Sequence, residues 1–172
     1  MGEPLRFAGM AKSYKSACKG PEGELWLAAA ADEFDRLIEA TATMRLIPWD
    51  KKPPKRKVSY YNSQIRIKTK SDGSREYRVR GTYGGDISDY RGPTCAQTAD
   101  MMSIKILLNA TASEEEKKFM SLGIKDFYLG TPMKEKEYMR IHISHIPPQS
   151  TRKYVSEDLI SDDGYVLAEI SI

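Results

Sequence analysis

Cysteine and histidine are scarce in this chain, which contains two of each in 172 residues. Cys18 and Cys95 lie far apart, and neither has a Cys or His at the spacing of metal ligands. The sequence therefore predicts neither a disulfide framework nor a zinc site. So few cysteines are typical of a reducing compartment, and we expect an intracellular protein, in the cytoplasm or the nucleus.

Long apolar runs are also absent. No segment is long and apolar enough to span a bilayer, and the first 22 residues contain no apolar run of signal-peptide length. We therefore expect no membrane partner. What the chain does have is enough apolar residues, 40 % of the total, for one core of ordinary size.

The charge is unevenly distributed along the chain. Residues 51–91 contain twelve lysines and arginines but four acids, a net charge of +8, although the whole chain carries only +3. The other residues therefore carry a net charge of −5. A basic segment beside an acidic remainder favours a surface that faces a polyanion. A solvated, lysine-rich hairpin is the alternative interpretation.

The first half of the chain shows clear periodic patterns. Residues 1–22 lack any period, and we interpret them as a flexible leader. Residues 23–40 predict a helix, because their apolar side chains recur on one face: Trp26, Ala30, Phe34, Leu37 and Ile38. Residues 58–69 and 75–83 alternate around an Asp-Gly turn and predict a hairpin, with Gly73 at positive φ. Residues 51–57 contain two prolines, which favour an extended conformation.

The second half is predicted to alternate between helix and strand. Thr98 is a candidate cap for a helix whose apolar stripe is Met101, Ile104, Leu107 and Leu108. Residues 119–124 and 137–143 predict buried strands, residues 151–160 a short helix, and residues 165–172 a last strand. This order of elements is typical of a mixed α+β fold.

Several motifs lie in the order found in one known family. Residues 119–133 and 137–141 read Phe119-Met-Ser-Leu-Gly-Ile-Lys-Asp-Phe-Tyr-Leu-Gly-Thr-Pro-Met133 and Glu137-Tyr-Met-Arg-Ile141. Before them come Trp26-Leu-Ala-Ala29 with Glu33, Ile65-Arg-Ile-Lys68, Asp72-Gly73, Tyr77-Arg-Val-Arg80, Gly84-Gly-Asp86, Asp89-Tyr90 and Ser103-Ile-Lys-Ile-Leu-Leu108. From residue 26 to about residue 143, the chain resembles the N-terminal part of copia-type retrotransposon reverse transcriptases.

This resemblance implies an incomplete right-hand polymerase fold, with fingers and the beginning of a palm. Residues 1–22 would be the leader, residues 23–95 a fingers-like helix and basic hairpin, and residues 96–172 the start of the palm with a degenerate first metal motif. The activity of the family is RNA-directed DNA synthesis, a nucleotidyl transfer assisted by two Mg²⁺ ions. The implied partners are an RNA or DNA template-primer and the remainder of a polyprotein.

The resemblance also implies roles for single residues. Arg80 would contact the triphosphate of an incoming nucleotide, with Arg78 and Lys68 beside it. Tyr128 would exclude a 2′-hydroxyl, and Asp126 would approach the phosphates. The alternative interpretations are exposed cross-strand charges for the three cations, a buried tyrosine and a helix cap.

The catalytic carboxylates of the family are not matched. Gly123 stands where the family carries its metal-holding aspartate, and no Tyr-x-Asp-Asp follows. Asp162-Asp163 lies in a Ser-Asp-Asp-Gly sequence, which we interpret as a surface turn, and the sequence ends at Ile172 before the next expected motif. His142 and His145, three apart on a predicted strand, would face opposite sides and share no metal. We therefore expect no catalytic residue, no bound metal and no polymerase activity for this chain alone.

Three functional hypotheses remain open from the sequence. The first is an inactive fragment of a reverse transcriptase, and the second a non-catalytic nucleic-acid-binding or interaction module derived from a retroelement. The third is a remnant without function, whose unfinished sheet would leave an open edge. Under the first two hypotheses, nucleic acid would also bind to a basic run that consists of Lys51, Lys52, Lys55, Arg56 and Lys57. The same run could instead be a nuclear-import signal.

Overall fold

The structure is a computed structural model that describes residues 13–88, Gly92 and residues 98–171, apart from the side chain of Tyr128. The chain divides into two compact units, and each is described by itself. The first unit consists of Met1–Asp89 and Tyr128–Ile172, and the second of Tyr90–Phe127.

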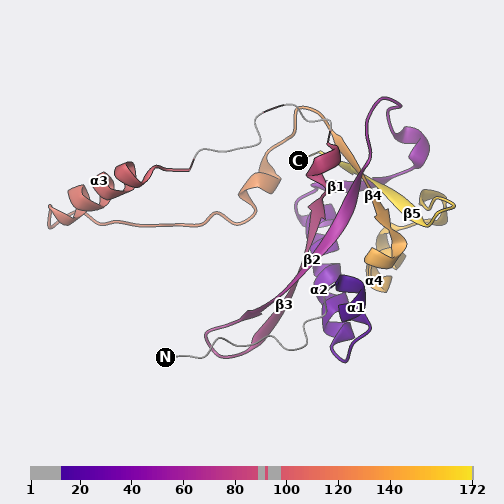
Figure 1. The fold of residues 1–172 in the computed structure, drawn as a ribbon, viewed down its shortest axis with the longest axis horizontal. Coiled ribbons are helices and arrows are strands. Elements are labelled where there is room, and N and C mark those ends of the chain that lie inside the picture. The colour runs from indigo at the N-terminus through magenta and orange to yellow at the C-terminus, as the bar shows by residue number, and fades with distance from the viewer. Residues whose placement is uncertain (1–12, 89–91, 93–97, 172) are drawn as a thin grey trace. The chain divides into compact units, whose positions relative to one another are not determined.

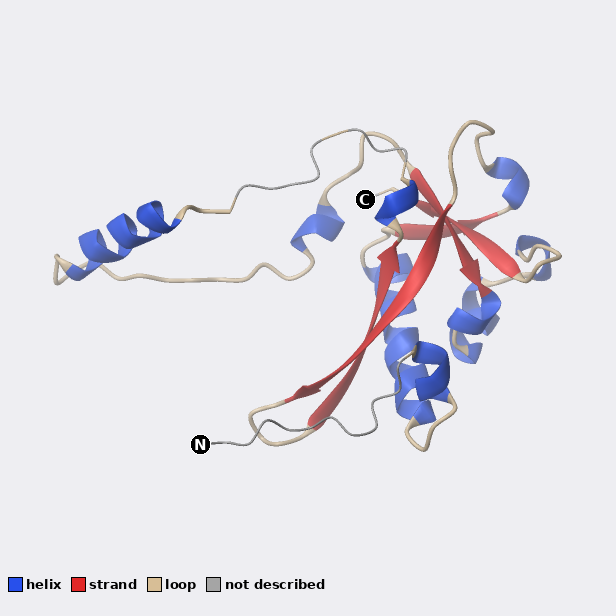
Figure 2. Ribbon diagram, in the orientation of Figure 1, coloured by secondary structure: helices blue, strands red, loops and turns tan. Residues whose placement is uncertain are grey.

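The first unit is built on a five-stranded sheet (Figure 1 and Figure 2). Its strands are β1 (Met44–Ile47), β2 (Ser59–Thr69), β3 (Arg75–Tyr83), β4 (Glu137–His142) and β5 (Tyr165–Ile170). They lie in the order β1-β5-β4-β2-β3, and all neighbours are antiparallel except β2 and β4. This sheet confirms the predicted α+β class, the hairpin and the strands near residues 137 and 165.

The parallel contact between β2 and β4 is short. It pairs Ser59 with Met139 and Tyr60 with Arg140. In contrast, β2 and β3 pair continuously from Tyr61 with Tyr83 to Thr69 with Arg75. The hairpin therefore continues well past the end of β4, as Figure 2 shows. Gly73 in its turn has φ of +81°, as the Asp-Gly sequence predicts.

Helices cover one face of this hairpin. The helix α2 (Gly23–Asp35) continues as a π turn over Arg36–Ala40 and packs along β3. Four of the five residues of the predicted stripe are buried and Ile38 packs against the core, so the predicted helix is confirmed. The short helix α4 (Pro148–Tyr154) also contacts α2.

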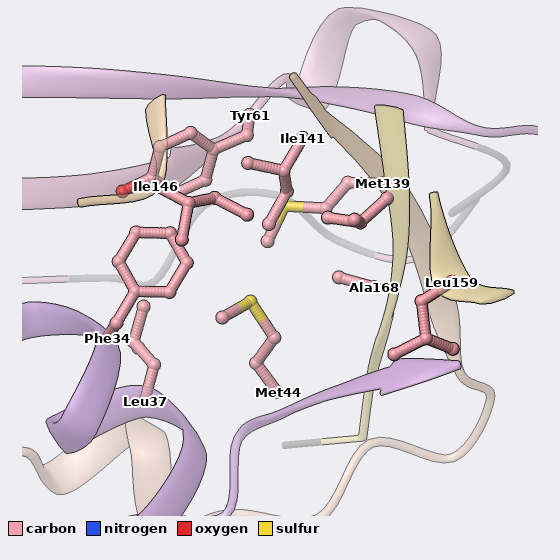
Figure 3. Packing of buried hydrophobic residues seen from close by; sticks show 10 residues of the cluster. Phe34, Leu37, Met44, Tyr61, Met139, Ile141, Ile146, Leu159 and Ala168 are labelled. Atoms are coloured by element: carbon pink, nitrogen blue, oxygen red, sulfur yellow. The ribbon is translucent and has the colours of Figure 1, made fainter. Parts of the chain in front are cut away.

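Apolar side chains form the main core between α2 and the sheet (Figure 3). The side chains of Phe34 and Leu37 from the helical segment meet Tyr61, Met139 and Ile141 from the central strands. Successive strand residues point to opposite faces, so Tyr138 and Leu167 form a smaller cluster with Ile47 on the other side of the sheet. The centre of the sheet is thus covered on both faces.

The flexible leader predicted for residues 1–22 is wrong for residues 13–22, and its residues 1–12 lie outside the described residues. Tyr14–Cys18 form the helix α1, and the side chains of Tyr14 and Ala17 are buried with Trp26, Ala30 and Val79. The prediction failed because a helix of five residues is too short to show a period in the sequence. Its position is determined by packing against α2 and the hairpin.

The second unit contains the helix α3 (Met101–Ala112). Its N-cap is Asp100 and not Thr98, because a carboxylate oxygen of Asp100 accepts a hydrogen bond from the Ser103 amide at 2.9 Å. The apolar residues of the predicted stripe are all exposed within this structure.

The predicted buried strand at residues 119–124 is wrong. No strand forms there, and the side chains of Phe119, Met120, Leu122 and Ile124 are each more than half exposed. Alternating apolar residues indicate a strand only where a neighbouring strand can pair with them, and no described strand does so here. The segment that would begin the palm therefore lies outside the sheet.

Gly81 is the position where the hairpin tolerates no side chain. A Cβ atom there would lie 2.8 Å from Oη of the buried Tyr61. We expect Gly81→Ala to lower the free energy of unfolding by about 2 kcal/mol, because the Tyr61 ring cannot move without disturbing the core. The measurement is the midpoint of urea denaturation. Gly85→Ala is the matched control, because no atom would lie within 4 Å of its Cβ. Equal midpoints for the two variants would contradict this account.

Candidate nucleic-acid interface

The outward face of the hairpin gathers basic side chains. Odd-numbered residues such as Val79 point to the helices, so even-numbered residues point away from them. The strand register places Arg66 opposite Arg78, Gln64 opposite Arg80 and Lys68 opposite Glu76. A concavity of about 450 Å³ is lined by Gln64, Ile65, Arg66, Lys68, Arg78 and Arg80. We call this surface the hairpin basic face.

One carboxylate partly balances the charge of this face. Arg78 donates hydrogen bonds of 2.9 and 3.1 Å to the two carboxylate oxygens of Glu76. These bonds from Arg78, helped by the charges of Lys70 and Lys68, hold the pKa of Glu76 below its usual value. Among the described residues, no carboxylate oxygen lies within 4.0 Å of Arg66, Lys68 or Arg80.

The basic face therefore holds four cations and one carboxylate. Like charges directly opposite each other on two strands destabilise a hairpin, and Arg66 faces Arg78 in this way. A bound anion would relieve this repulsion. Guanidinium groups suit such a ligand because their planar donors match the oxygens of a phosphate group.

The structure brings together three of the residues predicted to bind a nucleotide. Lys68, Arg78 and Arg80 share the basic face, while their role as ligand-binding residues stays a prediction. Asp126 belongs to the second unit, where it has a positive φ of 55°. The side chain of Tyr128 lies outside the described residues. The prediction missed Arg66, which the alternation of β2 could have identified.

The basic run at residues 51–57 is a folded loop and not an extended segment. A 3-10 turn covers Trp49–Lys51, and the amide of Arg56 donates to the carbonyl of Pro53 at 3.1 Å. The ammonium group of Lys52 donates to the carbonyl oxygens of Pro53 and Arg56 at 3.0 and 2.8 Å. Proline stiffens a chain but also initiates turns, and here the turn prevails.

Arg56 in this loop has a structural contact. Its guanidinium donates to Glu135 at 2.7 Å and to the buried Glu137 at 3.1 Å. The side chain of Arg56 is only 21 % exposed. Of the five cations predicted to bind nucleic acid, Lys52 and Arg56 therefore already donate hydrogen bonds to oxygen atoms of the protein. Lys51 lies 3.9 Å from Asp50, and Lys55 is exposed.

A buried carboxylate connects α2 to the hairpin. Glu33 is 6 % exposed, and its carboxylate accepts hydrogen bonds from Arg36 at 2.8 Å and from the amide of Gly81 at 3.0 Å. A buried charge is tolerated when it is paired and hydrogen-bonded, as here. Glu33 thus fixes β3 against the helix and positions the basic face.

The described residues do not fit the two-magnesium site that the resemblance implies. Within residues 13–88 and 98–171, no group of three or more His, Cys, Asp or Glu lies together as a metal site would require. Gly123 offers no ligand atom, and Asp162 and Asp163 are exposed in the turn before β5.

Comparison with models of protein families, with curated proteins and with solved structures found no match. The resemblance to reverse transcriptases therefore stays an expectation from the motifs. Within the part of the chain that the structure describes, no helix has the length and apolarity needed to cross a membrane.

Two adjacent residues of the basic loop, Arg56 and Lys55, should differ in their effect on stability. We expect Arg56→Gln to lower the free energy of unfolding by about 2 kcal/mol, because the buried Glu137 loses a charged hydrogen-bond partner. Urea denaturation at pH 7 measures this change. Lys55→Gln, one residue away on an exposed side chain, should leave the midpoint unchanged. If both variants shifted the midpoint alike, Arg56 would not have the structural role assigned to it.

Proposed function

We propose that this protein is a non-catalytic nucleic-acid-binding module whose ancestry lies in the fingers of a copia-type reverse transcriptase. The hairpin basic face is the observation that carries the proposal. The alternative, an inactive polymerase fragment with fingers and the start of the palm, has less support because residues 119–124 form no strand.

The composition of the basic face indicates which part of a nucleic acid it contacts. Between residues 62 and 82, the outward positions carry Asn62, Gln64, Arg66, Lys68, Glu76, Arg78, Arg80 and Thr82, without an aromatic side chain. Base stacking needs aromatic rings, whereas phosphate attraction needs only clustered positive charge. The proposed contacts are therefore to the phosphate backbone, and binding is independent of sequence.

The geometry of the hairpin supports this mode of binding. Side chains two residues apart on one strand are separated by about 7 Å, so the cations form two parallel rows. A two-stranded ribbon is also narrow enough to enter the major groove of a duplex. Because Glu33 and the core hold the other face of the hairpin, the cations are positioned before any ligand arrives.

The salt dependence of binding tests this proposal. Each phosphate that a cation neutralises releases counterions, so the slope of log K against log salt falls by about 0.9 per contact. We expect the double variant Arg66→Gln/Arg80→Gln to bind labelled RNA or DNA more weakly and to reduce this slope by about 2. Fluorescence anisotropy over a series of KCl concentrations provides the measurement.

Arg152→Gln is the matched control, because Arg152 is exposed on α4 away from the hairpin. It should reduce neither the affinity nor the slope. An unchanged slope in the double variant, or undetectable binding of the unmodified protein at low salt, would overturn the proposed function.

A further inference from the structure

A second concavity, of about 340 Å³, lies in the first unit beside the ends of β4 and β5. Residues from α1, β2, β4 and β5, and from the turn after β4, line it: Lys15, Tyr60, Tyr61, Arg140, His142, His145 and Tyr165. Its volume is at the lower end of the range of about 300–1,000 Å³ for small-molecule sites. We call it the histidine pocket.

The strand pairing explains how these residues meet. Arg140 lies beside Tyr60 in the parallel pair, and His142 lies opposite Tyr165 in the antiparallel pair. The strand β4 ends at His142, and Ile143–His145 form a 3-10 turn. This turn brings His145 to the same pocket as His142, although a strand through residue 143 would have separated them.

The positions of the pocket side chains are held by ring contacts. The guanidinium carbon of Arg140 lies 5.2 Å from the centre of the Tyr165 ring, a cation–π contact. His142 meets the same ring edge-on at 5.0 Å. His145 stacks on Tyr14 at 5.9 Å. Contacts with the rings of Tyr165 and Tyr14 therefore hold the side chains of Arg140, His142 and His145 in place.

The pocket has a net positive charge. Lys15 and Arg140 are its two cations, and no carboxylate from the described part of the chain lines it. Within the described residues, no carboxylate oxygen lies within 4.0 Å of either cation. The nearby Asp86 accepts a hydrogen bond from the hydroxyl of Tyr60 at 2.9 Å.

Two histidines add hydrogen-bonding ring nitrogens to the pocket. The amide of Ser144 donates to Nδ1 of His142 at 3.2 Å, so in the neutral ring the proton is on Nε2. Nδ1 of His145 lies 3.1 Å from the hydroxyl of Ser63. Burial lowers the pKa of His145, and the electrostatic interactions with Lys15 and His142 lower it further.

We propose that the histidine pocket binds a phosphate group between Lys15 and Arg140, with the imidazole rings of His142 and His145 as hydrogen-bond donors. Charged donors from separate elements form the short, strong hydrogen bonds that phosphate oxygens accept. The group could be inorganic phosphate or the phosphate of a nucleotide, which share this chemistry. The proposal uses no residue of the hairpin basic face, so either proposal can fail without the other.

The experiment titrates inorganic phosphate into the whole protein and follows the imidazole signals of both histidines by NMR. A bound anion stabilises the protonated imidazole, so the pKa of His145 should rise with phosphate but not with chloride at equal ionic strength. We expect Arg140→Gln and, separately, Lys15→Gln to weaken phosphate binding about tenfold, because each removes one charged hydrogen bond. Arg152→Gln is the control and should bind as the unmodified protein does.

A second arm identifies the source of the phosphate. Tighter binding of adenosine monophosphate than of inorganic phosphate supports a nucleotide, whereas equal binding supports the free anion. Adenosine itself should not bind. The proposal is overturned if the pKa of His145 is the same in phosphate and chloride. It is also overturned if both pocket variants, shown by circular dichroism to be folded, bind phosphate as well as the control does.

Discussion

Two buried carboxylates hold the β2–β3 hairpin to the rest of its unit, and the candidate sites depend on this attachment. Glu33 from α2 accepts from the amide of Gly81 in β3. Glu137 from β4 accepts from the hydroxyl of Tyr83 at 2.9 Å and from Arg56. A buried carboxylate without such partners would cost several kcal/mol. The sequence therefore has to supply Arg36 and Arg56 as well as the hairpin itself.

This attachment separates the two faces of the hairpin by role. One face packs Ile65, Ile67 and Val79 against apolar side chains of α1 and α2. The other face is left for cations, which cannot enter an apolar core without partners. The same alternation that builds the core thus gathers positive charge on the opposite side. The hairpin basic face follows from a period of two residues and from the choice of arginine and lysine at the outward positions.

The elements that the sequence predicted well are those with a local signal. The helix over residues 23–40 and the hairpin show their periods in a single window, and the Asp-Gly turn specifies the left-handed conformation of Gly73. The failures at α1 and at residues 119–124 concern segments whose structure depends on a distant partner. Tyr14 packs in the core cluster around Trp26, whereas the apolar residues near Gly123 pack against none of the described strands.

The two candidate sites also differ in whether a local sequence signal predicts them. The alternation of the two strands alone predicts that Arg66, Lys68, Arg78 and Arg80 lie on one face, whatever the rest of the fold. The histidine pocket could not be predicted in this way, because it needs α1, the three strands β2, β4 and β5, and a turn that begins one residue earlier than the sequence suggests. Positions three apart share a face only when the backbone turns, and here the chain turns at Ile143–His145, just before the buried Ile146 and Pro147.

The physical demands of phosphate binding and of two-metal catalysis differ, and this difference bears on the proposed ancestry of the chain. Two-magnesium transfer needs several carboxylates converging within a few ångströms, and Gly123 removes one of them outright. Attraction to phosphate falls off gradually with distance and tolerates the loss or displacement of a single cation. A hairpin that gathers cations on one face can therefore attract a polyanion without any metal ligand. The requirement that remains is a rigid support for the cations, and here Glu33, Glu137 and the apolar face of the hairpin supply it.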